Sequence, residues 1–266
     1  MSIGPTILTI LFFASFAFCA GLGVYALYLN PEKGVNRLLF LCCLAVSLWA
    51  LGFGAAINAA DAATCLLWRR VAALGWGSFF SFLLHFILAS TQPSLFRRRL
   101  WMQGLLYLPA IVSLEVFSLQ PDLSARQYQL VPSPLGWINL SYGNGWDWFY
   151  NVYYASFTGI GLFLLHRWRG RATTRQERAQ RSGLVPTFLV TLLLGTLTEM
   201  VFNTYLGIRL PQIGPILIAF PMFMMYRAIH QHGFLKLTTP MDERILTDQT
   251  RSLIFIGMAL SSAAGS

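Results

Sequence analysis

The sequence predicts an all-α integral membrane protein: a seven-transmembrane helix bundle with its N-terminus outside, a small outer β-hairpin and a truncated C-terminal connecting or eighth helix. Composition is the first observation. Hydrophobic residues make up 56% of the 266 residues and charged residues only 11%, whereas about a quarter of a soluble domain is charged. The length of the apolar segments and the placement of the basic residues are the other two observations.

Seven segments reach the length of roughly 20 mostly apolar residues that a membrane-spanning helix needs. The first begins almost at the N-terminus with no basic residue before it, so it lacks the positive region of a signal peptide and we expect it to be retained. The predicted spans are residues 5–29, 36–59, 66–91, 101–118, 148–167, 184–205 and 211–234.

The net charge of +9 is distributed unevenly. When alternate connecting segments are assigned to opposite sides of a membrane, 15 Lys and Arg residues lie on one side and 4 on the other. Basic residues concentrate in cytoplasmic loops, so the C-terminus is predicted to be cytoplasmic. Topology accounts for the basic excess, and we do not expect a nucleic-acid partner.

A short turn over residues 30–37 connects the first two spans. Pro31 cannot continue a helix, and Asn36 is placed to cap the second span. The turn begins a series of motifs that resembles the N-terminal seven-helix region of bacterial histidine kinases over residues 5–235. The motifs are Asn30-Pro31, Asn36-Arg37-Leu38-Leu39-Phe40, Trp49, Trp68-Arg69-Arg70, Gly75, His85-Phe86 and Tyr226-Arg227-Ala228-Ile229.

This resemblance implies a sensory receptor region of a two-component system in the bacterial inner membrane. Its signal would be a small molecule or a membrane property, relayed to a C-terminal histidine kinase, and a homodimer is implied because histidine kinases act as dimers. We therefore expect a sensor domain over 1–235. Residues 236–266 would form a cytoplasmic linker and the start of a further helix, with the effector beyond residue 266.

The one long outer loop covers residues 119–147. Alternating residues on both sides of the break at 132–136 predict a β-hairpin. A loop of this length in a compact protein tends to be functional, and this hairpin is placed to cover the outer mouth of the bundle.

Charged side chains inside spans are costly and are functional candidates by default. Glu115 and Glu199 lie at similar depth in the outer part of two spans, and Asn203 follows Glu199 at i+4 on the same helix face. The hypothesis is an outward-facing pocket for a small amphipathic or cationic ligand; the alternative is that both acids form structural ion pairs with arginines. The candidate ligand-binding residues are Glu115, Glu199, Asn203, Arg69, Arg70, Trp76, Tyr153 and Tyr154.

The motifs of several other functional classes are missing from the sequence. No catalytic residues, metal site or cofactor are predicted: the only lysines, Lys33 and Lys236, lie in loops, which excludes a retinal Schiff base. His85 is expected to be a packed, hydrogen-bonded histidine rather than a haem ligand. A sensor of a diguanylate cyclase is one alternative function. A small-molecule transporter is another, and would use helices broken near Pro109, Pro215 or Pro221.

Overall fold

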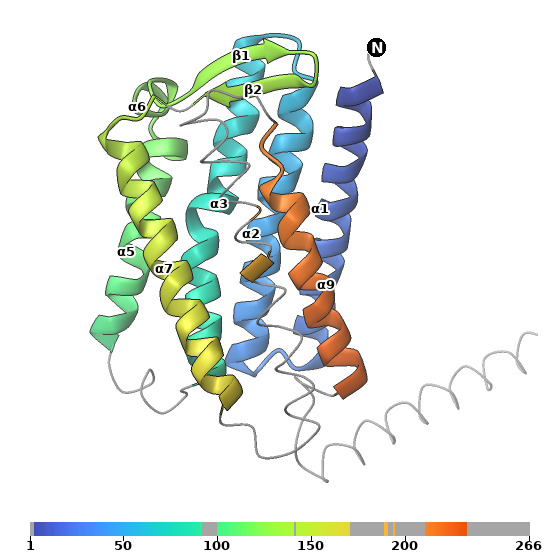
Figure 1. Ribbon diagram of the computed structural model, residues 1–266, viewed down its shortest axis with the longest axis vertical. Helices are drawn as coiled ribbons and strands as arrows, with labels where there is room; N and C mark the ends of the chain where they lie inside the picture. The colour runs from blue at the N-terminus through green and yellow to red at the C-terminus, as the bar shows by residue number, and fades with distance from the viewer. Residues whose placement is uncertain are drawn as a thin grey trace, which may run out of the picture.

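The computed structural model describes residues 3–91, 100–140, 142–170, 189–190, 194 and 211–232. Long helices run alongside one another and form a bundle, with a two-stranded hairpin across one end (Figure 1). We call this the hairpin end, and the opposite end, where α1 turns into α2, the turn end. The long helices are α1 (Ile3–Leu29), α2 (Gly34–Ile57), α3 (Ala62–Thr91), α5 (Leu100–Leu114), α7 (Gly145–Gly170) and α9 (Gly214–His232).

Four of the predicted spans are confirmed as helices long and apolar enough to cross a membrane: Gly4–Leu29, Gly34–Ile57, Ala62–Thr91 and Trp101–Leu119. The segment predicted at 148–167 is also helical, within α7. The segment predicted at 211–234 contains α9, whose apolar part is the shorter stretch Gly214–Met224. The span at 184–205 falls outside the described residues apart from positions 189, 190 and 194, and the linker at 236–266 falls outside them completely.

The centre of the bundle is the contact between α2 and α3, the most extensive between any two helices described. Two glycines, one in each helix, allow the backbones of α2 and α3 to lie close together. A Cβ on Gly75 would lie 2.2 Å from the Ala45 carbonyl oxygen, and one on Gly52 would lie 2.6 Å from the Trp68 carbonyl oxygen. Small residues let helix backbones approach in this way.

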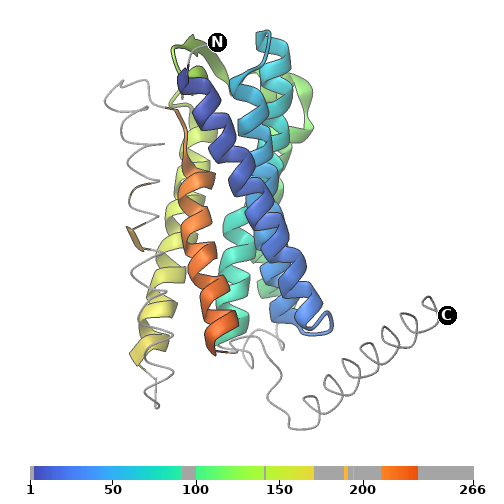
Figure 2. The same ribbon diagram turned by 90° about the vertical axis from the view of Figure 1, so that its right-hand side faces the viewer.

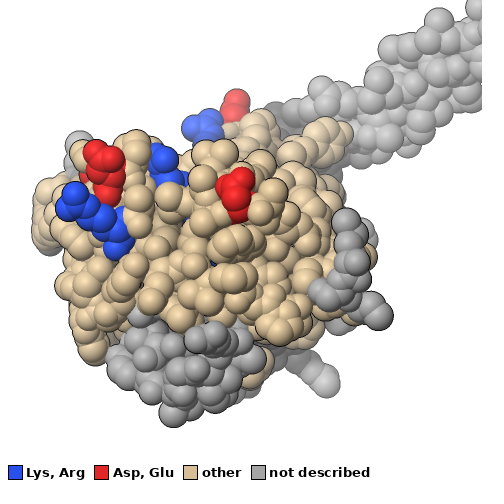
Figure 3. All heavy atoms as spheres, turned by 90° about the horizontal axis from the view of Figure 1, so that it is seen from above, with Lys and Arg blue, Asp and Glu red and all other residues tan. Residues whose placement is uncertain are grey.

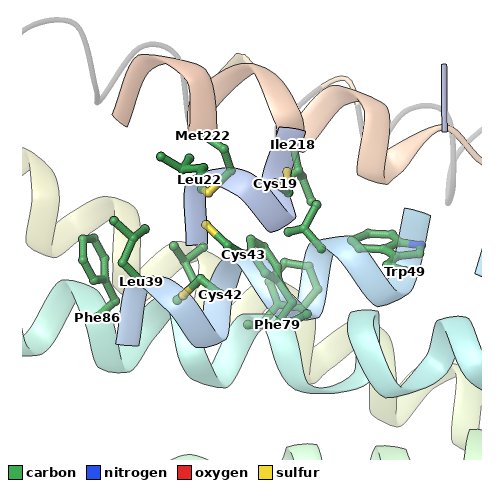
Figure 4. Packing of buried hydrophobic residues seen from close by; sticks show 14 of the residues in the cluster. Cys19, Leu22, Leu39, Cys42, Cys43, Trp49, Phe79, Phe86, Ile218 and Met222 are labelled. Carbon is green, nitrogen blue, oxygen red and sulfur yellow. The ribbon is translucent and has the colours of Figure 1, made fainter. Parts of the chain in front are cut away.

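Helix α9 runs beside α1, as the side view shows (Figure 2), and it also contacts α2. Figure 4 shows Ile218 and Met222 of α9 directed toward Cys19 and Leu22 of α1. Cys43 of α2 joins the same buried cluster. Burial of these apolar side chains fixes α9 against the first two helices.

The hairpin prediction is confirmed: β1 (Gln129–Ser133) pairs antiparallel with β2 (Gly136–Leu140), and Val131 lies opposite Ile138. The turn is shorter than the predicted break at 132–136, because Pro132 and Ser133 belong to β1. Two short elements before the hairpin were not predicted. They are η1 (Glu115–Leu119), a π-helical end to α5, and α6 (Pro121–Ala125).

The turn at 30–37 forms, but Asn36 does not cap α2, so that prediction is wrong. The residue at the N-cap position is Lys33, without a side-chain bond. Asn36 lies inside the first turn of α2, where its amide Nδ2 donates to the Ala26 carbonyl of α1 at 2.8 Å. Asn30 instead holds the turn itself, because its Oδ1 accepts from the backbone N–H of Glu32 at 3.1 Å and of Lys33 at 3.2 Å, just before α2 begins.

Candidate functional site

The hairpin is seated on the bundle by main-chain contacts at its turn. Gly136 has a φ of +97°, a conformation that favours glycine, and a Cβ there would lie 2.7 Å from the Ile57 carbonyl oxygen at the end of α2. Beside it, the Trp137 indole Nε1 donates to the Ala59 carbonyl at 2.8 Å. Viewed from this end, the surface is mainly uncharged with a few acidic and basic side chains (Figure 3).

Arg69 is buried beneath the hairpin, with only 3% of its surface exposed. Its guanidinium donates to the side-chain oxygen of Gln212, just before α9, and to the Trp137 carbonyl of β2 at 2.9 Å. The guanidinium carbon also lies 4.4 Å from the centre of the Phe53 ring on α2, a cation–π contact. Arg69 therefore joins α3 to α2, to the hairpin and to the start of α9.

Arg70 follows directly but reaches a different part of the fold. Its Nε donates to the Ser118 carbonyl at 2.8 Å and its second amino group to the Leu119 carbonyl at 3.3 Å. These carbonyls end η1, and the last carbonyls of a helix lack partners within the helix and favour a nearby cation. Ser118 returns a bond from its hydroxyl to the Arg70 carbonyl at 2.8 Å.

Tyr128 packs between the two arginines and η1. Its hydroxyl donates to the Phe117 carbonyl at 2.9 Å. Burial raises the pKa of the Tyr128 phenol, and the nearby guanidiniums of Arg69 and Arg70 oppose that rise. The phenol is therefore a hydrogen-bond donor throughout the physiological pH range.

Glu115 is exposed at the first position of η1, where it accepts a hydrogen bond from Gln120 Nε2 at 2.8 Å. Within the described part of the chain it forms no ion pair with Arg70, which is occupied by carbonyl groups. The other predicted acidic position, Glu199, and the predicted polar position Asn203 both lie outside the described residues.

The three predicted aromatic residues belong to one ring network between α3, η1 and α7. The Trp76 ring centre lies 4.6 Å from that of Tyr150 and 5.1 Å from that of Phe117. Phe80 extends the network to Tyr153 at 6.2 Å and Tyr154 at 4.8 Å. The structure thus brings the aromatic candidates together.

Tyr153 is also a polar contact inside this network. Its hydroxyl accepts from the Ser81 backbone N–H at 3.0 Å, and the two side-chain oxygens lie 2.8 Å apart. Ser81 Oγ in turn donates to the Leu106 carbonyl at 2.7 Å. These bonds link α3, α5 and α7 below the aromatic rings.

The remaining candidates for chemistry are packed residues. His85 Nδ1 lies 2.6 Å from the Tyr107 hydroxyl, the hydrogen bond that the packed-histidine interpretation predicts. All four cysteines are buried and form no disulfide. Over the ranges that the structure describes, no three His, Cys, Asp or Glu residues are grouped as metal ligands.

The described helices include four of membrane length, and the turn at 30–37 and the two arginines near the start of α3 carry motifs of the resemblance given above. Comparison with protein families matches residues 11–238 to the family described as the N-terminal 7TM region of histidine kinase. The chain belongs to this family. The match covers all the described helices except the start of α1, and it confirms the resemblance identified from the motifs. A search of curated proteins finds no match.

This histidine kinase 7TM region uses residues that sequence analysis did not single out. Gln212, Trp137 and Tyr128 contact the two arginines or the ends of the helices beside them. Trp137 and Tyr128 lay within the predicted outer loop, so a buried role for its aromatic residues could have been proposed. Gln212 carries no such signal, because it is a single amide between Pro211 and Ile213.

Proposed function

We propose that this 7TM region is a transmembrane receptor that relays a signal from the hairpin end of the bundle to a C-terminal cytoplasmic histidine kinase. The sensory role in a histidine kinase follows from the family. The seven spans, an N-terminus outside, a position in the bacterial inner membrane and action as a homodimer are parts of the proposal. They are supported by the charge asymmetry of the loops and by the family.

One observation carries the relay part of the proposal: α9 is packed against both α1 and α2 and starts beneath the hairpin. It is the last described helix, and together with the non-helical residues 211–213 before it, it leads from below the hairpin to the turn end (Figure 1). A ligand shifts such a bundle only through different affinities for two arrangements of its helices. A change at the hairpin end that moves α9 would reach the residues that follow it.

The proposed ligand region comprises the aromatic network and the polar groups near it. The aromatic candidates Trp76, Tyr153 and Tyr154 supply ring faces and edges, and Glu115 is an exposed carboxylate on η1, the element that contributes Phe117. Rings together with a carboxylate suit a small amphipathic cation. Glu199, Asn203, Arg69 and Arg70 remain proposed contacts.

The test uses the full-length protein in membrane vesicles, with autophosphorylation from labelled ATP as the output and hexyltrimethylammonium as the probe. We expect the cation to change the rate of autophosphorylation, and hexanol, its uncharged counterpart, to leave it unchanged. Glu115→Gln should weaken the response to the cation, whereas Glu32→Gln, which changes an acid in the turn at the other end, should not. Equal responses to cation and alcohol would contradict the proposed ligand class.

The two alternative functions give different outcomes in the same vesicles. Synthesis of a cyclic dinucleotide in place of autophosphorylation would identify the effector as a diguanylate cyclase. A transporter would accumulate labelled hexyltrimethylammonium. The helices that a transporter would break are continuous where they are described, since α5 continues through Pro109 and α9 contains both Pro215, near its start, and Pro221.

A further inference from the structure

We propose that Arg69 is a positioning residue that couples the hairpin to the start of α9, so that a displacement of one is passed to the other. The mechanical coupling follows from the contacts of Arg69 itself. Its use in signalling rests on the proposed receptor function. Arg69 would then serve the relay in addition to its proposed place at the ligand region.

Two hydrogen bonds of the Arg69 guanidinium join elements that are far apart in the sequence. One hydrogen bond goes to the Trp137 main-chain carbonyl, so it holds the backbone of β2 and not only a side chain. The other goes to Gln212, one residue before Ile213, whose carbonyl accepts the first bonds of α9 from Ile216 at 3.0 Å and Leu217 at 3.1 Å. The hairpin backbone and Gln212, two residues before α9 begins, are thus each one bond away from the same charged group.

Burial makes this connection stiff. A guanidinium that is 3% exposed cannot exchange a lost partner for bulk water, so the loss of either bond leaves a desolvated donor. The group is also confined from the side by the Phe53 ring at 4.4 Å. If either the Trp137 carbonyl or the Gln212 side chain moves, the guanidinium therefore tends to follow it, and the other partner tends to follow the guanidinium.

Arg70 provides a matched comparison because it is the adjacent residue with the same side chain. Its bonds go to the Ser118 and Leu119 carbonyls of η1, and Ser118 bonds back to it. Neither the hairpin strands nor α9 are among these partners. Coupling between hairpin and α9 should depend on Arg69 and be insensitive to Arg70.

The experiment is hydrogen–deuterium exchange of the full chain in lipid nanodiscs, followed for the hairpin amides at 129–140. Gln212→Leu removes the acceptor on the α9 side without touching the hairpin. If Arg69 couples the two elements, the hairpin amides should exchange about tenfold faster, the effect of losing one hydrogen bond to a charged group. Acceleration confined to α9 would overturn the proposal.

Two further variants keep the test decisive. Gln212→Glu retains an acceptor and makes its bond charge-assisted, so hairpin protection should equal or exceed that of the wild type, and a loss of protection would refute the coupling. Arg70→Gln should accelerate exchange around η1 and leave exchange in α9 and the hairpin unchanged.

Hydrogen–deuterium exchange does not measure signalling, so the coupling and the proposed function can fail separately. If the exchange results show coupling but hexyltrimethylammonium does not change autophosphorylation, the proposed ligand response is contradicted and the coupling by Arg69 still holds.

Discussion

The two ends of the bundle are held together in different ways. At the turn end, hydrogen bonds are local: Asn30 bonds to the backbone two and three residues later, and Asn36 connects α2 to α1, its neighbour in the chain. At the hairpin end, the bonds join distant segments. Arg69 reaches residues 68 and 143 positions away, and the Trp137 indole reaches back 78 positions to Ala59.

This difference is the structural basis for proposing that the hairpin end, and not the turn end, receives the signal. Among the described residues, the side-chain hydrogen bonds of the turn at 30–37 stay within the turn, α1 and α2. A change at the hairpin end has direct contact with α2, α3, η1 and the start of α9 through a few buried side chains. The following four predictions test this contrast, from the largest expected effect to the smallest.

The largest effect is expected at the seam between α2 and α3, which both ends share. Gly75→Ala would place a Cβ 2.2 Å from the Ala45 carbonyl oxygen and 2.6 Å from the Trp49 nitrogen, both backbone atoms that cannot move aside. Such overpacking costs about 1–3 kcal/mol. Thermal unfolding in detergent should show a clear fall in Tm. Gly104→Ala is the control, since nothing lies within 4 Å of its added Cβ and the substitution should not lower Tm.

At the turn end, Asn36→Ala removes the buried bond to the Ala26 carbonyl. The loss should destabilise the protein by about 1–2 kcal/mol, because the carbonyl is left buried without that partner. The contrast between the ends predicts that the hairpin amides keep their wild-type exchange rates. Faster exchange in the hairpin of this variant would show that the two ends are not separate.

At the hairpin end, Trp137→Phe retains an aromatic ring but removes the indole donor to Ala59. We expect a loss of about 1 kcal/mol and faster exchange in the hairpin and in the first turn of α9, in contrast to Asn36→Ala. Trp146→Phe, at an exposed tryptophan of α7, is the matched control and should change neither Tm nor exchange. If exchange in the first turn of α9 is unchanged in Trp137→Phe, the hairpin does not influence α9.

The smallest effect is a pH dependence at the start of α3. The Asp61 carboxylate accepts from the Thr64 backbone N–H at 2.7 Å. Hydrogen bonds from the Thr64 backbone and side chain lower the pKa of Asp61 below its ordinary value. A carboxyl whose pKa is lowered by folding stabilises the folded state above its unfolded pKa, near 4. Protection of the Thr64 amide should therefore fall slightly as the pH drops below about 4. In Asp61→Asn, which keeps a capping oxygen, this pH dependence should disappear.

Much of the fold could be predicted because membrane spans leave a simple signal. Length and apolarity located the confirmed helices, and alternation with Gly and Pro located the hairpin. Asn36 was misjudged because its type and position suit a cap equally well, and only the proximity of α1 gives its amide another acceptor. The bridge from Arg69 to Gln212 could not be predicted, since the partners are 143 residues apart and no spacing rule connects them.

The π-helical end of α5 has a consequence for the phase of the chain that follows it. Each residue of an α-helix advances the side chains by about 100° around the axis, and a π-helical hydrogen bond, such as that from Gln120 N–H to the Glu115 carbonyl, spans one residue more than an α-helical one. With this π-helical end, Ser118 and Leu119 present their carbonyls to Arg70. Deleting one residue between 115 and 119 would turn these carbonyls away with no change of charge. The number of residues in η1, and not their charge, would then decide how the chain leading to the hairpin meets Arg70.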